Sequence, residues 1–306
     1  MRLSFALMLC LPSVSLAQTK EMVEAVERKL ATLKYIQSLE APGGGFYVTP
    51  PAKSDAKPVS SLRATNGAVR AWRYLGGDNL GSKFPNKEKH AAFVLSCYDP
   101  KTGAFAEPGG KPDVTITSIG VMAAAELGIP HEKYAKAMDY LKENAKTFEE
   151  VRIGAAAVEA WGVKDCPFEL KPWRRIANGF AGMDALDAKD GGARNTGSLV
   201  AFVLRLGQDL PRGADVNPIF ANGQRDDGGW GKAGEKASDI ETTYRVMRAL
   251  MLLKEKPKDA KKLREFIDAH RNKDGGYATK PGDKSSMSGV YYCVIVSKWL
   301  DDMEKK

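Results

Sequence analysis

The residues best suited to chemistry in this chain stand close together, at Asp239 and Glu241. A pair of carboxylates can act as acid and base on a glycosidic bond, and two carboxylates can also hold a hard cation such as magnesium. On a regular helix, side chains two positions apart diverge by about 200° and do not share a face. They can still converge at the start of a helix, where Asp239 would be the N-cap residue.

The sequence gives less support to a catalytic serine or cysteine nucleophile or to a cysteine metal site. The chain has no G-x-S-x-G nucleophile motif and no C-x-x-C pair for zinc or redox work. Beyond the N-terminal segment it holds Cys97, Cys166 and Cys293, an odd number at irregular spacing. One disulfide and one free thiol would fit an exported protein, but the spacing does not choose the pair.

A recurring glycine turn shows how the chain is organised. It appears at Gly44-Gly45-Phe46, Gly103-Ala104-Phe105, Gly191-Gly192, Gly228-Gly229-Trp230 and Gly275-Gly276-Tyr277. Corresponding positions are 59, 88, 37 and 47 residues apart, and 88 is two periods of 44. A period of roughly 40 to 50 residues is typical of stacked helical hairpins. Two glycines permit the positive φ that such a reversal needs, and we expect the aromatic residue after them, such as Trp230, to fill the gap between hairpins.

Apolar helical segments follow these turns. We predict inner helices at Ser60 to Leu75, Val114 to Leu127, Glu150 to Trp161, Arg194 to Leu206, Ile240 to Leu253 and Ser286 to Leu300. Amphipathic partner helices are expected between them, for example at His131 to Leu141 and Lys258 to His270. The fold prediction is an all-α (α/α)6 toroid of six helical hairpins, with an open solenoid as the alternative. His90, His131 and His270 fall on the outer helices in this arrangement.

The N-terminus predicts export. Arg2 precedes an apolar run from Leu3 to Val14, and Ser15-Leu16-Ala17 is a small-x-small cleavage site. We predict a signal peptide over residues 1–17 and a single toroid domain over residues 18–306, placed in the periplasm or secreted. No later stretch is long and apolar enough to form a transmembrane segment.

The charge of the chain bears on its partners. The whole sequence has 46 basic and 38 acidic residues, a net charge of +8. The lysines are spread through the chain without a nucleic-acid-binding motif, so we expect no nucleic-acid partner. A positive solvated surface explains this balance, and an anionic ligand or envelope surface is the alternative.

Two motifs point to a family. Gln224 to Trp230 has the form Q-x3-G-x-W and resembles the QW motif of terpene and squalene cyclases. Phe93 to Cys97, followed by Gly103 to Phe105 and Pro108 to Pro112, resembles a repeat of Rab geranylgeranyltransferase β subunits. Over roughly residues 30 to 300 the chain therefore resembles the prenyltransferase and squalene-cyclase repeat family, above all the protein prenyltransferase β subunits. The resemblance implies a toroid with a central apolar cavity.

The resemblance also implies a metal site, from which this chain departs. The β subunits hold a catalytic zinc through an Asp, a Cys two residues later and a His in the next repeat. Asp239 matches the Asp, but Glu241 stands at the Cys position and Gly289, give or take one residue, at the His position. Zinc needs at least three such ligands. We therefore expect no metal and no cofactor.

The same resemblance suggests where a head group would bind. Lys236 matches the basic residue that holds the diphosphate in the family, and Lys232 lies one position from another. With Trp230, Asp239 and Glu241 they form the predicted substrate-binding set, and no catalytic residue is assigned. Charge reversal at Lys236 and added salt should weaken the binding of an anionic amphiphile.

Three functions remain open. The first is a prenyltransferase or terpene-cyclase enzyme of isoprenoid chemistry, although the D-x-D-D acid of the cyclases is missing. The second is a toroid that binds an apolar or anionic amphiphilic ligand in its cavity, and the third is a carbohydrate-active (α/α)6 enzyme. Export and the missing ligands favour the binding role, with transferase activity left uncertain. The sequence does not reveal whether a partner subunit exists.

Overall fold

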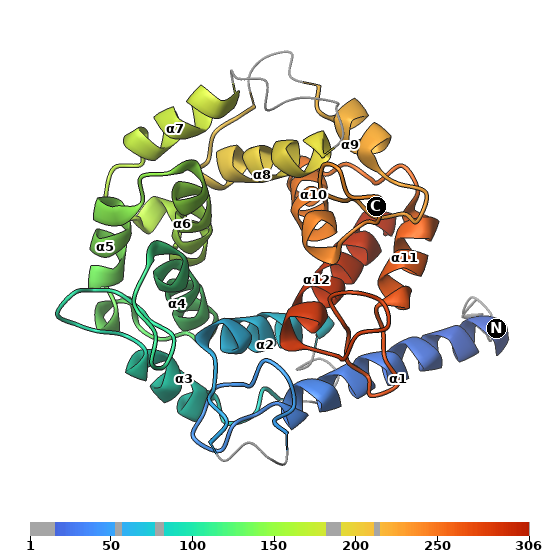
Figure 1. The fold of residues 1–306 in the computed structure, drawn as a ribbon, viewed down its shortest axis with the longest axis horizontal. Coiled ribbons are helices and arrows are strands. Elements are labelled where there is room, and N and C mark those ends of the chain that lie inside the picture. The colour runs from blue at the N-terminus through green and yellow to red at the C-terminus, as the bar shows by residue number, and fades with distance from the viewer. Residues whose placement is uncertain (1–15, 53–56, 77–82, 182–190, 211–214, 306) are drawn as a thin grey trace, which may run out of the picture.

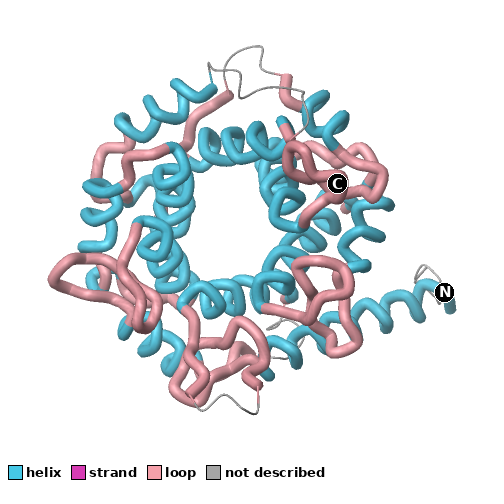
Figure 2. Tube along the Cα trace, in the orientation of Figure 1, coloured by secondary structure: helices cyan, strands magenta, loops and turns pink. Residues whose placement is uncertain are grey.

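The computed structural model describes residues 16–52, 57–76, 83–181, 191–210 and 215–305. Within these ranges the chain contains twelve α-helices and no strand. Figure 1 and Figure 2 show these helices as two concentric rings, with long loops gathered at the ends of the hairpins.

Six helices form the inner ring: α2 (Leu62–Leu75), α4 (Val114–Glu126), α6 (Phe148–Trp161), α8 (Gly192–Arg205), α10 (Ile240–Leu253) and α12 (Met287–Glu304). Each packs against the next along the chain, and α12 packs back against α2. The ring is therefore closed, which confirms the predicted (α/α)6 toroid and rejects the open solenoid.

Six helices form the outer ring: α1 (Leu16–Ser38), α3 (Lys87–Ser96), α5 (Lys136–Asn144), α7 (Lys171–Ala181), α9 (Asn217–Gly223) and α11 (Ala260–Ala269). The segment 131–141, expected as one helix, is divided into a 3-10 turn (His131–Lys133) and α5. The break occurs at Tyr134, whose backbone leaves the helical region while its side chain is fully buried.

Five of the six inner helices begin with side-chain caps, and α8, whose N-cap residue is Gly191, begins without one. Ser61, Asp113, Thr147, Asp239 and Ser286 each accept a hydrogen bond from the backbone N–H three residues later. These caps explain why the predicted segments start with small polar residues. First-turn residues of five inner helices, α2, α4, α6, α10 and α12, line one cavity, and last-turn residues of α2, α4 and α6 line another. These five inner helices are thus parallel, with their positive dipole ends at one mouth.

The turn at Trp230 joins neighbouring hairpins. Gly228 has φ of 90°, and a Cβ there would collide with the backbone of Lys262 on α11. Trp230 is only 1% exposed, and its indole N–H donates to the Phe220 carbonyl at 2.8 Å. The side-chain amide of Gln224 donates to the Gly228 carbonyl at 2.8 Å. The motif therefore stabilises the packing of neighbouring hairpins in the outer layer.

The histidines have structural contacts in the outer layer. The Nδ1 of His90, on α3, accepts a hydrogen bond from the Gly45 amide at 2.9 Å, and burial lowers the pKa of this imidazole. His270 is buried at the end of α11. His131 stacks on Trp161 with 3.8 Å between the ring centroids.

The N-terminal prediction lies almost entirely outside the described part of the chain. Of residues 1–17, only Leu16 and Ala17 are described, at the start of α1. No helix among the described residues has the length and apolar character required to cross a membrane. The predicted signal peptide therefore remains a prediction.

Candidate functional site

The inner ring encloses a cavity of about 350 Å³ at the end where its helices begin. We name it the N-chamber. Its charged lining residues are Arg63, Arg70, Arg152, Arg205, Arg245, Glu149, Glu150 and Glu241. Apolar lining comes from Ile119, Met122, Ile153 and Met287, and aromatic lining from Tyr244, Tyr291 and Tyr292. The chamber is thus a mixed surface, with an excess of positive side chains.

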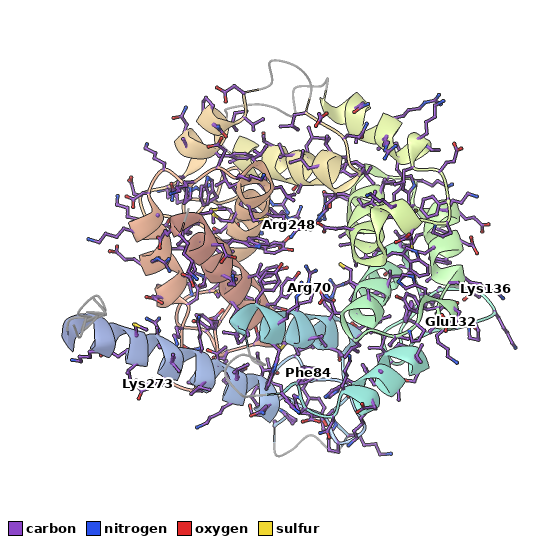
Figure 3. The ribbon with its side chains drawn as sticks, turned by 180° about the vertical axis from the view of Figure 1, so that it is seen from behind. Arg70, Phe84, Glu132, Lys136, Arg248 and Lys273 are labelled. Atoms are coloured by element: carbon purple, nitrogen blue, oxygen red, sulfur yellow. The ribbon has the colours of Figure 1, made fainter. Side chains whose placement is uncertain are left out.

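A second cavity of about 340 Å³, the C-chamber, lies toward the opposite ends of the helices. Its charged lining residues are Arg70, Arg73, Arg248, Glu126 and Glu159. The two chambers share Arg70 and Ala156, so they meet in the middle of the ring. Figure 3 shows Arg70 and Arg248 on the inner side of the ring.

A cluster of ion pairs lies where the chambers meet. We name it the girdle, and it consists of Arg70, Arg73, Arg205, Arg248, Glu126 and Glu159. Glu126 on α4 lies 2.8 Å from the Nη1 of Arg73 and 3.4 Å from the Nε of Arg70. Glu159 on α6 lies 3.1 Å from the Nε of Arg205 and also pairs with Arg248. Arg70, Arg205 and Arg248 are only 7%, 7% and 6% exposed. Buried charges of this kind are costly unless they are paired.

The pairing of Arg70 is incomplete. Its Nε makes no hydrogen bond within the described part of the chain, and its Nη1 contacts only the Met122 sulfur, at 3.6 Å. The guanidinium carbon lies 5.8 Å from the centre of the Tyr291 ring, a cation–π arrangement. Arg70 therefore retains donor capacity at the floor of the N-chamber, where an anion could use it.

Two phenols face these arginines. The hydroxyl groups of Tyr244 on α10 and Tyr291 on α12 lie 3.2 Å apart. Burial alone would raise the pKa of Tyr244, but three guanidinium groups and the Tyr291 hydroxyl outweigh it and lower that pKa to about 8. Burial raises the pKa of Tyr291 well above its ordinary value. The two phenols are therefore chemically distinct.

The carboxylates at the mouth are engaged with arginines or backbone. Glu241 accepts from Arg245 at 2.7 Å. Glu149 accepts from Arg152 at 2.7 Å and lies 3.8 Å from Arg245; burial raises its pKa, but the arginines outweigh this and lower it. Glu150 accepts from backbone N–H groups in a capping box, which lowers its pKa too. Glu149 and Glu150 are therefore stabilised in their ionised form.

The structure separates the predicted site residues. Glu241 lines the N-chamber, while Asp239 caps α10 by accepting from the Thr242 amide at 2.8 Å. Lys232 and Lys236 lie exposed on the loop before α10 and are not among the residues lining the N-chamber. Trp230 is buried behind that loop. Of the five, only Glu241 faces the chamber; a binding role for the others remains a prediction.

Sequence reasoning missed the buried arginines. Arg70 stands within a run of buried residues on α2, and Arg248 interrupts an apolar stretch of α10. Arg205 closes α8 after a buried apolar segment. A charged residue at a core-facing helical position is a signal that could have been read, because such residues are rarely buried without a partner.

The residues at the family's zinc positions do not fit a zinc ion. Glu241 is held by Arg245, and Asp239 uses one oxygen in its cap. At Gly289 even a Cβ would collide with the Tyr277 carbonyl, so no imidazole could stand there. Among the described residues, no three His, Cys, Asp or Glu side chains group as metal ligands would. The expectation of no metal remains a prediction.

Comparison with known proteins now decides the family. The sequence model of the prenyltransferase alpha-alpha toroid domain matches residues 3–162 and 173–305. The chain belongs to this family. This match confirms the resemblance that the QW-like turn suggested. No curated protein sequence matches the chain.

Solved structures share the fold. The type II terpene cyclase MstE from Scytonema, in its apo form, has a TM-score of 0.63 at 10% identity, covering 93% of this chain and 99% of that one. Its complex with geranylgeranyl dihydroxybenzoate has a TM-score of 0.62 at 10% identity, covering 94% and 99%. A wild-type glycosidase has a TM-score of 0.55 at 15% identity, covering 93% and 98%. At such identities the likeness shows the toroid fold alone.

Proposed function

We propose that this toroid is exported and binds a small anionic amphiphile in the N-chamber, without transferring a prenyl group. The observation that carries this proposal is the positive lining of the chamber, where five arginines face three glutamates. The parallel inner helices add the positive ends of their dipoles at the same mouth. Together they favour a ligand with a negative head group.

The rest of the lining suits an apolar tail. Ile119, Met122, Ile153 and Met287 lie on the wall of the same chamber. Pockets that combine an apolar wall with a few charged groups usually fix both ends of a ligand. The related toroid MstE was solved with geranylgeranyl dihydroxybenzoate, which joins a prenyl chain to a benzoate. A ligand of that general type supports the proposal for this chain.

The site chemistry gives less support to catalysis. A glycosidase needs one carboxyl group with a raised pKa to act as an acid. Arginines lower the pKa of Glu149, and backbone hydrogen bonds lower that of Glu150. The prenyl-transfer ligands are replaced by Glu241 and Gly289, and a D-x-D-D motif is missing from the sequence. Binding is therefore the role that these residues support best.

Calorimetry at neutral pH tests the binding role. The probe is octanesulfonate, with octan-1-ol as its uncharged counterpart. We expect octanesulfonate to bind and octan-1-ol to bind much more weakly, because the alcohol cannot pair with the arginines. Failure of octanesulfonate to bind would contradict the proposed function.

Two variants locate the head group. Arg70→Gln should raise the dissociation constant about tenfold to a hundredfold, the usual range for a charged hydrogen bond. Glu126 keeps its 2.8 Å pair with Arg73, so this variant leaves no unpaired carboxylate; an unchanged melting temperature would confirm that it folds. Lys236→Glu serves as the comparison. If Lys236→Glu abolishes binding while Arg70→Gln does not, the head group lies at the lysines and the N-chamber proposal is wrong.

Export has its own test. Expression in a host with a general secretion pathway, followed by N-terminal sequencing of the extracytoplasmic protein, should show a mature chain that begins at Gln18. A chain that stays in the cytoplasm with residues 1–17 intact would reject export without affecting the ligand site.

A further inference from the structure

The girdle between the chambers holds more positive charge than its carboxylates balance. Arg70 comes from α2, Arg205 from α8 and Arg248 from α10, and all three are buried. Glu159 on α6 is shared by Arg205 and Arg248. The carboxylate beside Arg70 is Glu126, which also pairs with the more exposed Arg73. One buried positive charge therefore lacks a carboxylate of its own.

Tyr244 stands where that missing negative charge would be. The helices packed against α10 are α8 and α12. Tyr244 lines the N-chamber together with Arg205 from α8 and Arg70 from α2. From α12, Tyr291 and Tyr292 contact its ring and line the same chamber. Arg248 lies one turn along α10 itself. The Tyr244 ring also stacks on Trp299, with 5.4 Å between the ring centroids. The guanidinium carbon of Arg248 lies 5.5 Å from the centre of the same indole.

Tyr244 and Tyr291 differ in how readily they lose their proton. The two hydroxyl groups lie 3.2 Å apart and either could be the donor. Because the pKa of Tyr291 lies well above its ordinary value, we assign Tyr291 as the group that keeps its proton and donates the hydrogen bond to the Tyr244 oxygen. The pKa of Tyr244 is lowered to about 8 despite its burial. Near neutral pH the proton of Tyr244 remains free to be donated elsewhere, and above that pH its loss leaves a phenolate among the arginines.

We propose that the anionic head group binds on Arg70 and Arg205 beside Tyr244, and that Tyr244 is the internal counter-anion that must take up a proton for the head group to bind. This inference rests on the proposed function and adds its head-group subsite. In the unliganded protein at mildly alkaline pH, the Tyr244 phenolate balances the arginines. When an oxyanion arrives, one proton from solvent neutralises the phenolate, and the Tyr244 hydroxyl donates a hydrogen bond to the oxyanion.

The sign of the pH effect follows from this balance. A bound anion disfavours the phenolate, so it raises the pKa of Tyr244. Binding then consumes a proton above the pKa of the free protein, and affinity falls as pH rises. For one proton and a pKa of about 8, the dissociation constant should increase about tenfold from pH 7 to pH 9. Below about pH 7 it should be flat, since Tyr244 is already protonated.

Octanesulfonate is the probe for this test because its head group stays singly charged across that range. Calorimetry from about pH 7 to 9 should show the loss of affinity in the wild type. The same experiment in buffers of different ionisation enthalpy should show the uptake of one proton near the upper end. Tyr244→Phe should bind with an affinity that hardly changes with pH, and Tyr140→Phe, on the outer helix α5, should behave like the wild type.

Near-ultraviolet absorption provides a readout without ligand. One tyrosine of the wild type should ionise near pH 8, this transition should be missing in Tyr244→Phe, and Tyr291→Phe should shift it upward by removing the donated hydrogen bond. Octanesulfonate that binds at pH 7 with an affinity independent of pH would overturn the subsite and leave the proposed function standing. Absence of binding at pH 7 would overturn both. A pH dependence that survives in Tyr244→Phe would assign the proton to another group and overturn the role of Tyr244.

Discussion

The indole N–H of Trp230 donates to the carbonyl of Phe220 at 2.8 Å, which ties a turn to the helix that precedes it. The aromatic ring fills the space behind the loop leading to α10 and is almost completely buried. This residue therefore stabilises the fifth hairpin through packing and a buried hydrogen bond.

Truncation of this side chain should be costly. Trp230→Ala should lower the free energy of unfolding by about 3 to 5 kcal/mol, because a large buried side chain leaves a cavity. Chemical denaturation of the purified protein measures the change. Trp230→Phe, which keeps most of the packing but loses the hydrogen bond, should cost less. A change below about 0.5 kcal/mol for Trp230→Ala would show a surface position instead.

Acid should lower the free energy of unfolding, because protonation of Glu159 removes its ion pairs with the girdle arginines. Burial raises the pKa of this carboxyl, but Arg205, Arg248 and Arg70 outweigh it and hold the pKa below its ordinary value. A group whose pKa is lower in the folded state stabilises the fold above its unfolded pKa, and that contribution is lost as pH falls through the folded pKa. We expect wild-type stability to fall below about pH 4.5 and Glu159→Gln to fall less over the same range.

A matched substitution controls that experiment. Glu143→Gln removes an exposed carboxylate from α5 and should retain the acid sensitivity of the wild type. Denaturation curves at several pH values measure all three proteins. Equal acid sensitivity in Glu159→Gln and the wild type would show that the girdle does not contribute to the pH dependence of stability.

The substitutions at the family's metal positions predict no zinc chemistry. Glu241 in place of a thiolate and Gly289 in place of an imidazole leave Asp239 as the one matching ligand. We expect elemental analysis of the dialysed protein to find no stoichiometric zinc, and a peptide thiol to receive no prenyl group. One equivalent of zinc that survives dialysis and disappears in Asp239→Ala would reverse this conclusion.

The three cysteines beyond the N-terminal segment should all be free thiols. Cys97, Cys166 and Cys293 are unpaired in the structure, and Cys293 is completely buried on α12. Burial raises the pKa of Cys97 to about 11 and that of Cys293 well above its ordinary value, so both should react slowly in the folded protein. A thiol titration of the unfolded mature chain should find three per molecule. A value of one would indicate a disulfide.

The architecture can be predicted from the sequence because the signals for it are local and repeated. The glycine turns, the caps such as Asp239 and the apolar segments after them each act within one hairpin. Ile240 to Leu253 was predicted with the bounds that α10 has. Stacking such hairpins leaves few arrangements, and closure of the ring buries the apolar faces of the inner helices.

The charged lining of the cavities could not be predicted in this way, because it depends on contacts between distant helices. Arg70, Arg205 and Arg248 are far apart in the sequence, and they meet because α2, α8 and α10 face one axis. Lys232 and Lys236 stand close to α10 in sequence, yet they lie on its exposed loop. Ring closure brings distant helix faces together, and burial then makes each charge there depend on its neighbours. Local spacing carries no information about that convergence.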